Sequence, residues 1–357
     1  MKKTIAVLPG DGVGPEIIDQ AVKVLQKVAK IYHHEFSFEY GLIGTTAIEK
    51  TGNPLPDQTL KLCKDSDAIL FGAIGDQKYD NDPSAKIRPE QGLLELRKSL
   101  ALFVNIRPIF VFPTLINSSP LKAEVVKDSD FIVIRELTGG IYFGKPRMRK
   151  NHGKTAIDTS IYSESEIERI ARVAFEISRK RNKNVVSIDK ANVLETSRLW
   201  RETVTKTGKE YPDVELSHMF VDTASMQIIK NPQQFDVILT ENMFGDILTD
   251  EASVISGSIG LLPSASIGER HALYEPIHGA YNKAAGKNTA NPIAAILSVE
   301  MMLKYSFHLV KEWKCIWNAV VKTLEEGWRT KDLVAKETEK EKVIGTKEMG
   351  DKITNNI

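Results

Sequence analysis

The stretch VLPGDGVGPEII, Val7–Ile18, joins a short apolar run to a glycine-rich turn and then to a helical pattern. A strand, a loop and a helix in this order bring backbone N–H groups to a helix start, where an anion can bind. The glycines fall at Gly10, Gly12 and Gly14, however, which gives G-x-G-x-G and not the G-x-G-x-x-G of dinucleotide-binding loops. The spacing therefore predicts a tight turn, with Pro15 at the first helical position, where its missing N–H does no harm.

The composition is that of an ordinary globular protein. The 357 residues are 42% hydrophobic and 27% charged, which suggests two domains or one large one with an ample core. A formal net charge of +1 gives no electrostatic signal for nucleic acid or membrane. No apolar run approaches a membrane span or a secretion signal, and the two cysteines, Cys63 and Cys315, have no metal-binding spacing. We expect a cytoplasmic protein.

Short apolar runs alternate with helical patterns along most of the chain. The expected strands are Ala68–Gly75, Phe131–Glu136, Asn184–Asn192, Met219–Ser225 and Phe235–Asn242, and the expected helices include Ser163–Lys180, Glu195–Thr207 and Ile247–Ser256. This alternation predicts an α/β fold of mainly parallel sheets flanked by helices.

Residues 138–163 depart from that alternation. They are rich in glycine, β-branched, aromatic and basic residues and show no helical period. We expect an antiparallel excursion, an arm, at this place. Because open strands need covering, the arm suggests a partner subunit.

Charged residues follow several of the apolar runs, and the carboxyl ends of parallel strands are where α/β sheets bind ligands. Asp246 and Asp250 are four residues apart, which places both carboxylates on one helix face. With Asp222 they would form a hard-cation site. An exposed acidic helix start is the alternative.

Three arginines, Arg97, Arg107 and Arg135, complement these carboxylates. Arginine binds carboxylates bidentately, so the set suits a small substrate with two or more acid groups, although surface ion pairs are common. Lys190 near a metal and arginines suits a general base, because like charges lower the pKa of an amine. Tyr142 is a candidate proton donor.

A late segment, Glu275–Pro292, collects small residues that would let the backbone approach a flat ligand. His278 and Asn291 within it could hydrogen-bond or stack on a base. Taken alone, the segment is a loop with turn residues.

At this point the segments LPGDGVGPE, RPEQGLLELRKSLALFVNIRP, SIDKANVLETSRLWRE and FDVILTENMFGDILTDE resemble the isocitrate/isopropylmalate dehydrogenase family of metal-dependent β-decarboxylating dehydrogenases. The match runs in order over nearly the whole chain. RELTGGIYFG together with GLLELRK is typical of the isopropylmalate branch. The resemblance implies an oxidoreductase that converts (2R,3S)-3-isopropylmalate to 4-methyl-2-oxopentanoate with reduction of NAD, in leucine biosynthesis.

The resemblance also implies a two-domain fold that is not a standard Rossmann fold. Residues 1–102 and 257–357 would form a cofactor-binding domain, and residues 103–256 an inserted substrate and dimerisation domain with its arm at about 138–163. Related enzymes are homodimers whose shared active sites each take the positions matched by Lys190, Asn192 and Asp222 from the neighbouring subunit. The turn at Gly10–Pro15 would border the cofactor groove.

Site roles are implied position by position. The residues matching the carboxylate-binding positions are Arg97, Arg107 and Arg135, and those matching the Mg²⁺ or Mn²⁺ ligands are Asp222, Asp246 and Asp250. Lys190 matches the base for the C2 hydroxyl, and Tyr142 matches the acid that protonates carbon. The substrate side chain would meet Glu90, Leu93 and Leu94 of the same subunit, and Val193 of the partner subunit. The cofactor positions match Glu275, His278, Gly279 and Asn291.

One cofactor position departs from the family pattern, because Lys283 stands where NAD-using members carry an aspartate. A lysine here resembles NADP-using isocitrate dehydrogenases, so NADP is the alternative to NAD. Isocitrate, homoisocitrate, tartrate and other alkylmalates are alternative substrates. A non-catalytic metabolite-binding subunit is an alternative of another class, but Lys190, Tyr142 and the three aspartates are all present.

Overall fold

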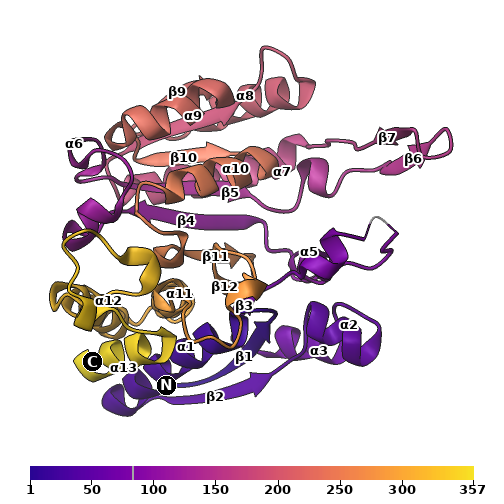
Figure 1. Cartoon of the computed structure of the whole chain (residues 1–357). Coiled ribbons are helices and arrows are strands. Elements are labelled where there is room, and N and C mark those ends of the chain that lie inside the picture. Colours follow the sequence, from indigo (N-terminus) through magenta and orange to yellow (C-terminus); the bar gives the residue numbers. More distant parts are fainter. Residues whose placement is uncertain (83) are drawn as a thin grey trace. The chain divides into compact units, whose positions relative to one another are not determined.

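Strands and helices alternate along the chain, as the apolar runs predict (Figure 1). The computed structural model describes residues 1–82 and 84–357. It divides into unit 1, made of Met1–Leu102, Thr114–Ser118 and Ser256–Ile357, and unit 2, made of Phe103–Pro113 and Ser119–Ile255. No helix of the described residues is long and apolar enough to cross a membrane.

The strands of unit 1 lie in the order β2 (Glu35–Tyr40), β1 (Lys2–Gly10), β3 (Ala68–Ala73), β12 (Ala272–Pro276) and β11 (Pro263–Ile267). All pairs are parallel except β11 with β12. The helices are α1 (Gly14–Tyr32), α2 (Thr45–Thr51), α3 (Asp57–Asp65), α4 (Gln77–Asp80), α5 (Pro89–Ser99), α11 (Ile293–Tyr305), α12 (Val310–Glu325) and α13 (Thr346–Asn356). This is not the strand order of the dinucleotide-binding fold, so the expectation of a non-Rossmann α/β fold is confirmed.

Helix α11 forms the centre of unit 1. Every residue from Ile293 to Leu303 is buried. A helix without a solvent face is apolar all round and loses the periodic pattern by which surface helices are recognised. For that reason hydrophobic periodicity does not predict this helix.

The main strands of unit 2 lie in the order β4 (Val104–Phe110), β5 (Asp130–Glu136), β10 (Val237–Thr240), β8 (Asn184–Asp189) and β9 (Glu215–Phe220). Only β4 and β5 pair antiparallel among these. The helices are α6 (Ala123–Val126), α7 (Glu164–Arg179), α8 (Glu195–Gly208), α9 (Val221–Lys230) and α10 (Asn242–Ser253). Helix α7 starts where expected because Ser163 and Glu166 form a capping box.

The strand expected at Met219–Ser225 is wrong in its second half. Strand β9 ends at Phe220 and helix α9 begins at Val221. The β-branched Val221 and Thr223 favour a strand, but Asp222 lies in the first helical turn, where an acidic side chain meets the positive end of the helix. The helix therefore follows the strand directly, with Asp222 in its first turn.

The segment at residues 138–163 contains a short 3₁₀ turn, η2 (Gly140–Tyr142), and an antiparallel pair, β6 (Met148–Lys150) with β7 (Thr155–Ile157). This two-stranded ribbon extends away from the larger strands of unit 2 (Figure 1). All its residues are exposed except the half-buried Ile157. An isolated two-stranded ribbon is marginally stable in water.

Candidate active site

The aspartate of the glycine-rich turn before α1 binds backbone N–H groups of neighbouring segments. Asp11 is only 4% exposed, and its carboxylate accepts backbone N–H groups from Thr45 (3.0 Å), Thr46 (3.2 Å) and Gly75 (2.9 Å). Helix α2 has Gly44 at its N-cap, which offers no side chain, so Asp11 supplies the missing anion. The carboxylate of this turn is thus bound by the start of α2 and by Gly75, and the turn lacks the glycine spacing of a phosphate loop.

The glycines of this turn permit close backbone contacts. Gly12 has a φ of +58°, and a Cβ added there would lie 2.0 Å from the carbonyl oxygen of Ala280. The neighbouring Val13 donates its N–H to the same oxygen at 2.8 Å. The tight turn predicted from the spacing is confirmed, and it holds the segment at Ala280 against the start of α1.

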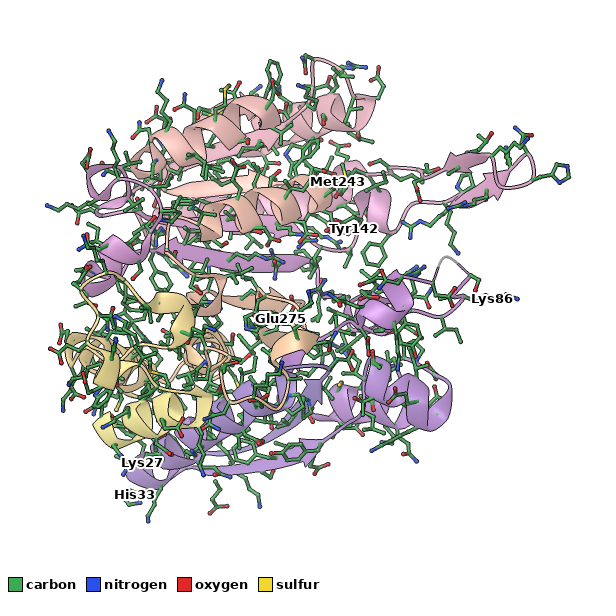
Figure 2. The ribbon with its side chains drawn as sticks, viewed as in Figure 1. Lys27, His33, Lys86, Tyr142, Met243 and Glu275 are labelled. Atoms are coloured by element: carbon green, nitrogen blue, oxygen red, sulfur yellow. The ribbon has the colours of Figure 1, made fainter. Side chains whose placement is uncertain are left out.

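Three of the predicted site residues contact a fourth, Asp246, in unit 2. Its carboxylate accepts a hydrogen bond from Nη1 of Arg135 at 2.5 Å and one from the hydroxyl of Tyr142 at 2.9 Å. Nη2 of Arg107 lies 3.6 Å away. Tyr142 comes from η2 (Figure 2), while Asp246 belongs to α10. Residues 139 positions apart in sequence, from Arg107 to Asp246, therefore share one charge cluster.

The arginines of this cluster are buried, whereas its aspartate is partly exposed. The side chains of Arg107 and Arg135 are 7% and 2% exposed, whereas that of Asp246 is 37% exposed. Helix α10 packs closely on Arg135, because a Cβ at Gly245 would lie 2.7 Å from Cγ of that arginine. Two buried cations thus support a carboxylate that still reaches solvent.

The titration of the neighbouring groups follows from the same charges. Burial and then the negative charge of Asp246 raise the pKa of Tyr142 to about 12, so its hydroxyl stays protonated at neutral pH. Asp250 lies one helical turn beyond Asp246. Desolvation by the surrounding protein raises the pKa of Asp250, Arg107 opposes this, and the charge of Asp246 adds to it.

Asp246 and Asp250 fit a divalent cation. They offer hard oxygen donors on one helix face, and a dication would offset both the burial that raises the pKa of Asp250 and the smaller repulsion from Asp246. Among the described residues, no group of three histidine, cysteine, aspartate or glutamate side chains could hold a metal. Asp222 therefore does not complete a three-carboxylate site within one chain.

Lys190 pairs with Asp222. Its Nζ lies 2.6 Å from the carboxylate and 6.0 Å from the ring centroid of Phe220. The hydrogen bond from Lys190 lowers the pKa of Asp222. The surroundings expected for Lys190 include a metal and a neighbouring subunit, so its role as a base stays a prediction. Asn192 and Val193, which follow it, are exposed.

In unit 1, two residues with separate predicted roles bind each other. Nη2 of Arg97 lies 2.7 Å from Oε1 of Glu275 on β12 (Figure 2), and their side chains are 9% and 7% exposed. Nε of Arg97 is buried without a partner among the described residues. Leu93, expected in a substrate wall, packs in the hydrophobic core of the unit, whereas Glu90 and Leu94 are half-buried.

The residues expected at the cofactor all lie in unit 1. A cavity of about 320 Å³ is lined by Lys283 and Glu90, together with Asp76, Asp80 and the segment Ala280–Asn282, among others. Nδ2 of Asn291 donates to Asp332, and its Oδ1 accepts the N–H of Ile293, each at 3.0 Å. The Asn291 side chain is thus bonded to the first residue of α11, two positions along the chain. His278 is half-buried and Gly279 is exposed.

Two amides beside the arginines were missed by the sequence analysis. Oδ1 of Asn105 accepts from Nε of Arg107 at 2.7 Å, and Oδ1 of Asn242 accepts from Nε of Arg135 at 3.1 Å. Spacing gave a usable signal in both cases. Asn105 lies two residues before Arg107 on one strand face, and Asn242 lies four residues before Asp246 on one helix face.

A model of the isocitrate/isopropylmalate dehydrogenase family matches residues 4–353, and the chain belongs to that family. The resemblance seen in the sequence segments is thereby confirmed.

Individual relatives narrow the comparison. The 3-isopropylmalate dehydrogenase of Aquifex aeolicus is 56% identical over 360 residues, covering 100% of this chain and 98% of the relative. That of Wolinella succinogenes is 55% identical and covers 99% of this chain and 98% of the relative. Among solved structures, an isocitrate dehydrogenase from Methylococcus capsulatus superimposes with a TM-score of 0.88 at 33% identity, covering 99% of both chains. A β-decarboxylating dehydrogenase from Thermococcus kodakarensis gives 0.78 at 33% identity, covering 99% of this chain and 96% of its own.

Proposed function

We propose that the chain catalyses the oxidative decarboxylation of (2R,3S)-3-isopropylmalate to 4-methyl-2-oxopentanoate, with NAD as oxidant and Mg²⁺ or Mn²⁺ as the metal, in cytoplasmic leucine biosynthesis. Full-length relatives at about 55% identity carry the name 3-isopropylmalate dehydrogenase, which supports the choice of substrate. The observation that carries the chemistry is the cluster of Arg107, Arg135 and Tyr142 around Asp246.

The arginines are suited to a dicarboxylic acid. Arg107 and Arg135 are already buried and charged, so the cost of desolvating them has been met in folding, and a substrate carboxylate gains strong charge-assisted hydrogen bonds. Arg97 adds a buried Nε–H that lacks an acceptor among the described residues. We assign all three to substrate binding.

Two residues move protons in this scheme. Lys190 takes the proton of the C2 hydroxyl, and Tyr142 returns a proton to C3 once CO₂ has left. Because the pKa of Tyr142 is raised to about 12, its hydroxyl stays protonated at neutral pH and can donate that proton to C3 after decarboxylation. Asp246 and Asp250 would hold the metal together with Asp222 of the partner subunit. When bound, NAD would accept the hydride, and the metal would act as a Lewis acid.

Helix α5 of unit 1 favours an alkyl substituent. Leu94 offers an apolar surface, and Glu90 offers a negative charge. A third carboxylate, as in isocitrate, would be repelled by Glu90, whereas an isopropyl group would not.

The charges around Lys283 favour NAD. The cavity that Lys283 lines is also lined by three carboxylates, those of Asp76, Asp80 and Glu90. A ribose 2′-phosphate placed there would meet more negative than positive charge. We therefore retain NAD, although a lysine at this position resembles NADP-using relatives.

A turnover assay tests the proposal. The purified chain is given 3-isopropylmalate, isocitrate, homoisocitrate or tartrate, each with Mn²⁺ and either NAD or NADP, and reduced nicotinamide is followed by absorbance. We expect the highest kcat/KM with 3-isopropylmalate and NAD. A higher value with isocitrate would overturn the substrate, and a higher value with NADP would overturn the cofactor. Turnover of none of the four would favour the non-catalytic alternative.

The exposed surface of unit 2 supports a homodimer with shared active sites. Met226 on α9 and Ile247 on α10 are 61% and 59% exposed, and these two helices pack on each other. The ribbon of β6 and β7 is uncovered as well. A second copy of the chain would bury both features.

Removing the ribbon tests that assembly. Replacing residues 149–156 by a two-residue glycine linker should convert a dimer to a monomer and abolish turnover, because the positions of Lys190 and Asp222 would no longer reach a second subunit. Light scattering coupled to size exclusion gives the mass, and circular dichroism checks the fold. An active monomer would contradict the shared site.

A further inference from the structure

Asn242 is a buried amide, only 1% exposed, that contacts the proposed site in more than one place. Its Oδ1 accepts from both Nε (3.1 Å) and Nη2 (2.7 Å) of Arg135. Its Nδ2 donates to the carbonyl oxygen of Gly139 at 3.1 Å. The amide oxygen thus binds Arg135, a proposed substrate-binding residue. The amide nitrogen binds Gly139, which directly precedes the 3₁₀ turn that carries Tyr142, the proposed proton donor.

The contact with Arg135 fixes the orientation of the guanidinium. A guanidinium presents its N–H groups in a rigid planar fork, so an acceptor on the Nε and Nη2 edge decides which way the rest of the fork points. In this chain Nη1 then points to Asp246 at 2.5 Å. Without the amide oxygen, two donors of a fully buried arginine would lose an acceptor, and the side chain would turn to satisfy them.

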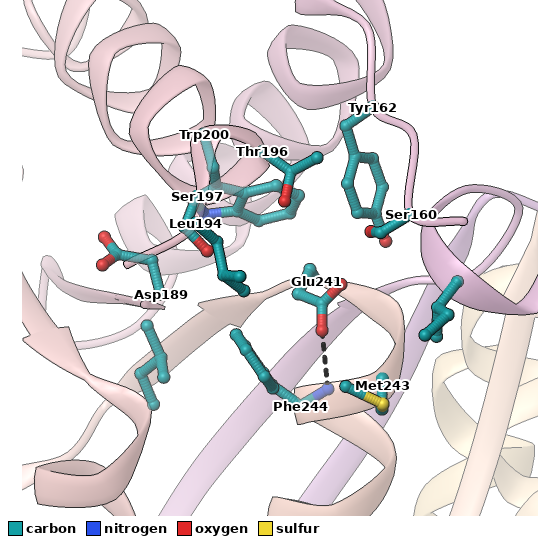
Figure 3. A pocket seen from close by; sticks show the side chains of 12 residues that line it. Ser160, Tyr162, Asp189, Leu194, Thr196, Ser197, Trp200, Glu241, Met243 and Phe244 are labelled. Carbon is teal, nitrogen blue, oxygen red and sulfur yellow. Dashed lines mark hydrogen bonds between the residues drawn. The ribbon is translucent and has the colours of Figure 1, made fainter. Parts of the chain in front are cut away.

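Neighbouring groups hold Asn242 itself. Its backbone N–H donates to the hydroxyl of Tyr162 at 2.9 Å, and Glu241 before it caps α10 by accepting the N–H of Phe244 at 3.0 Å. Tyr162 and Glu241 both line a cavity of about 220 Å³ in unit 2 (Figure 3). The first turn of α10 is therefore anchored independently of the arginine.

From these contacts we propose that Asn242 is the positioning residue of Arg135: it holds one edge of the guanidinium so that the other is presented to a substrate carboxylate. The inference rests on the proposed function, since it assumes that Arg135 binds substrate. Asn105 has the same relation to Arg107, because its Oδ1 accepts a hydrogen bond from Nε of that arginine at 2.7 Å. Nη1 of Arg107 donates to the hydroxyl of Thr249 at 2.5 Å. Two arginines on adjacent strands are thus each oriented by an asparagine.

The experiment is a double-mutant cycle between Asn242 and Arg135, read as KM and kcat. Asn242→Ala should raise KM for 3-isopropylmalate about tenfold to a hundredfold, the range for a lost hydrogen bond to a charged group. KM for NAD should stay within about twofold, since NAD does not contact Arg135 in this proposal. In an Arg135→Lys background, which has no fork to orient, Asn242→Ala should add less than about threefold.

Matched variants separate positioning from folding. Asn242→Asp keeps the acceptor oxygens and should recover most of the loss in KM. Ser187→Ala also removes a buried side-chain acceptor in unit 2, that of Nε1 of Trp200 at 3.2 Å, and should leave KM unchanged. If Asn242→Ala does not fold, Asn242→Ser takes its place.

Equal losses in both arginine backgrounds, or an unchanged KM, would overturn the inference. Failure of the wild type to oxidise 3-isopropylmalate would instead overturn the proposed function. The cycle would then be run with the dicarboxylate that the wild type does oxidise.

Discussion

Two aspartates, one in each unit, collect hydrogen-bond donors in opposite ways. Asp11 in unit 1 is 4% exposed and accepts three backbone N–H groups, those of Thr45, Thr46 and Gly75. Asp246 in unit 2 has a side chain that is 37% exposed and is surrounded by Arg107, Arg135 and Tyr142.

The difference lies in what the donors are able to do. Backbone N–H groups belong to the fold and cannot leave, so Asp11 is a permanent part of the turn and of the start of α2. Side-chain donors can rotate to another acceptor, and Asp246 reaches solvent, so its partners can be exchanged for a ligand. A carboxylate bound by backbone N–H groups indicates a structural role. One bound by arginine and tyrosine side chains at the solvent boundary indicates a role in ligand binding or catalysis.

The largest expected effect comes from Asp246→Asn. Turnover of 3-isopropylmalate should fall about a thousandfold or more, because Asp246, the proposed metal ligand and the partner of Tyr142, loses its charge. The free energy of unfolding should change by no more than about 1 kcal/mol, since the group is partly solvated and the amide keeps an acceptor. Steady-state kinetics and urea unfolding give the two numbers. Asp213→Asn, which breaks an exposed pair with Arg179, is the control and should alter neither.

Asp11→Asn should give the reverse result. The amide retains one acceptor oxygen but turns an NH₂ group toward the N–H of Thr46, so we expect a loss of about 2 kcal/mol in the free energy of unfolding. Activity per folded molecule should fall far less than in Asp246→Asn, because Asp11 binds backbone groups and none of the proposed catalytic or metal-binding side chains. Urea unfolding and an active-site titration check both values. Unchanged stability with lost turnover would erase the distinction between the two aspartates.

A third carboxylate sharpens the comparison. Glu300 on α11 is only 6% exposed, within a helix that is buried from Ile293 to Leu303. Burial raises its pKa to about 7, opposed weakly by Lys304. The protonated form is therefore favoured in the folded chain, and the free energy of unfolding should fall as pH rises from about 4.5 through 7.

The corresponding variant is Glu300→Gln, which cannot ionise. It should match wild type at pH 5 and exceed it by about 2 kcal/mol at pH 8, measured by urea unfolding at both values. Glu325→Gln on the exposed surface of α12 is the matched control and should show no such pH dependence. A wild type as stable at pH 8 as at pH 5 would contradict the buried carboxyl.

Much of the fold and part of the site could be predicted from residues alone. Periodicity located α7 and α8, and spacing identified the turn at Gly10–Gly14 and the shared helix face of Asp246 and Asp250. Periodicity failed for α11, which is buried all round, and at Val221, where β-branched residues begin a helix. The roles assigned to Lys190 and to the cofactor residues stay predictions.

The sequence by itself determined which groups are present: the arginines, the aspartates, the tyrosine and the strand ends that carry them, because local pattern and residue chemistry are properties of short segments. Only the tertiary structure decided their partners. It joined Arg97 to Glu275 and placed Asn242 behind Arg135, because both pairings link residues more than a hundred positions apart. Contacts of that range follow from how strands are ordered in a sheet, and no short segment encodes that order.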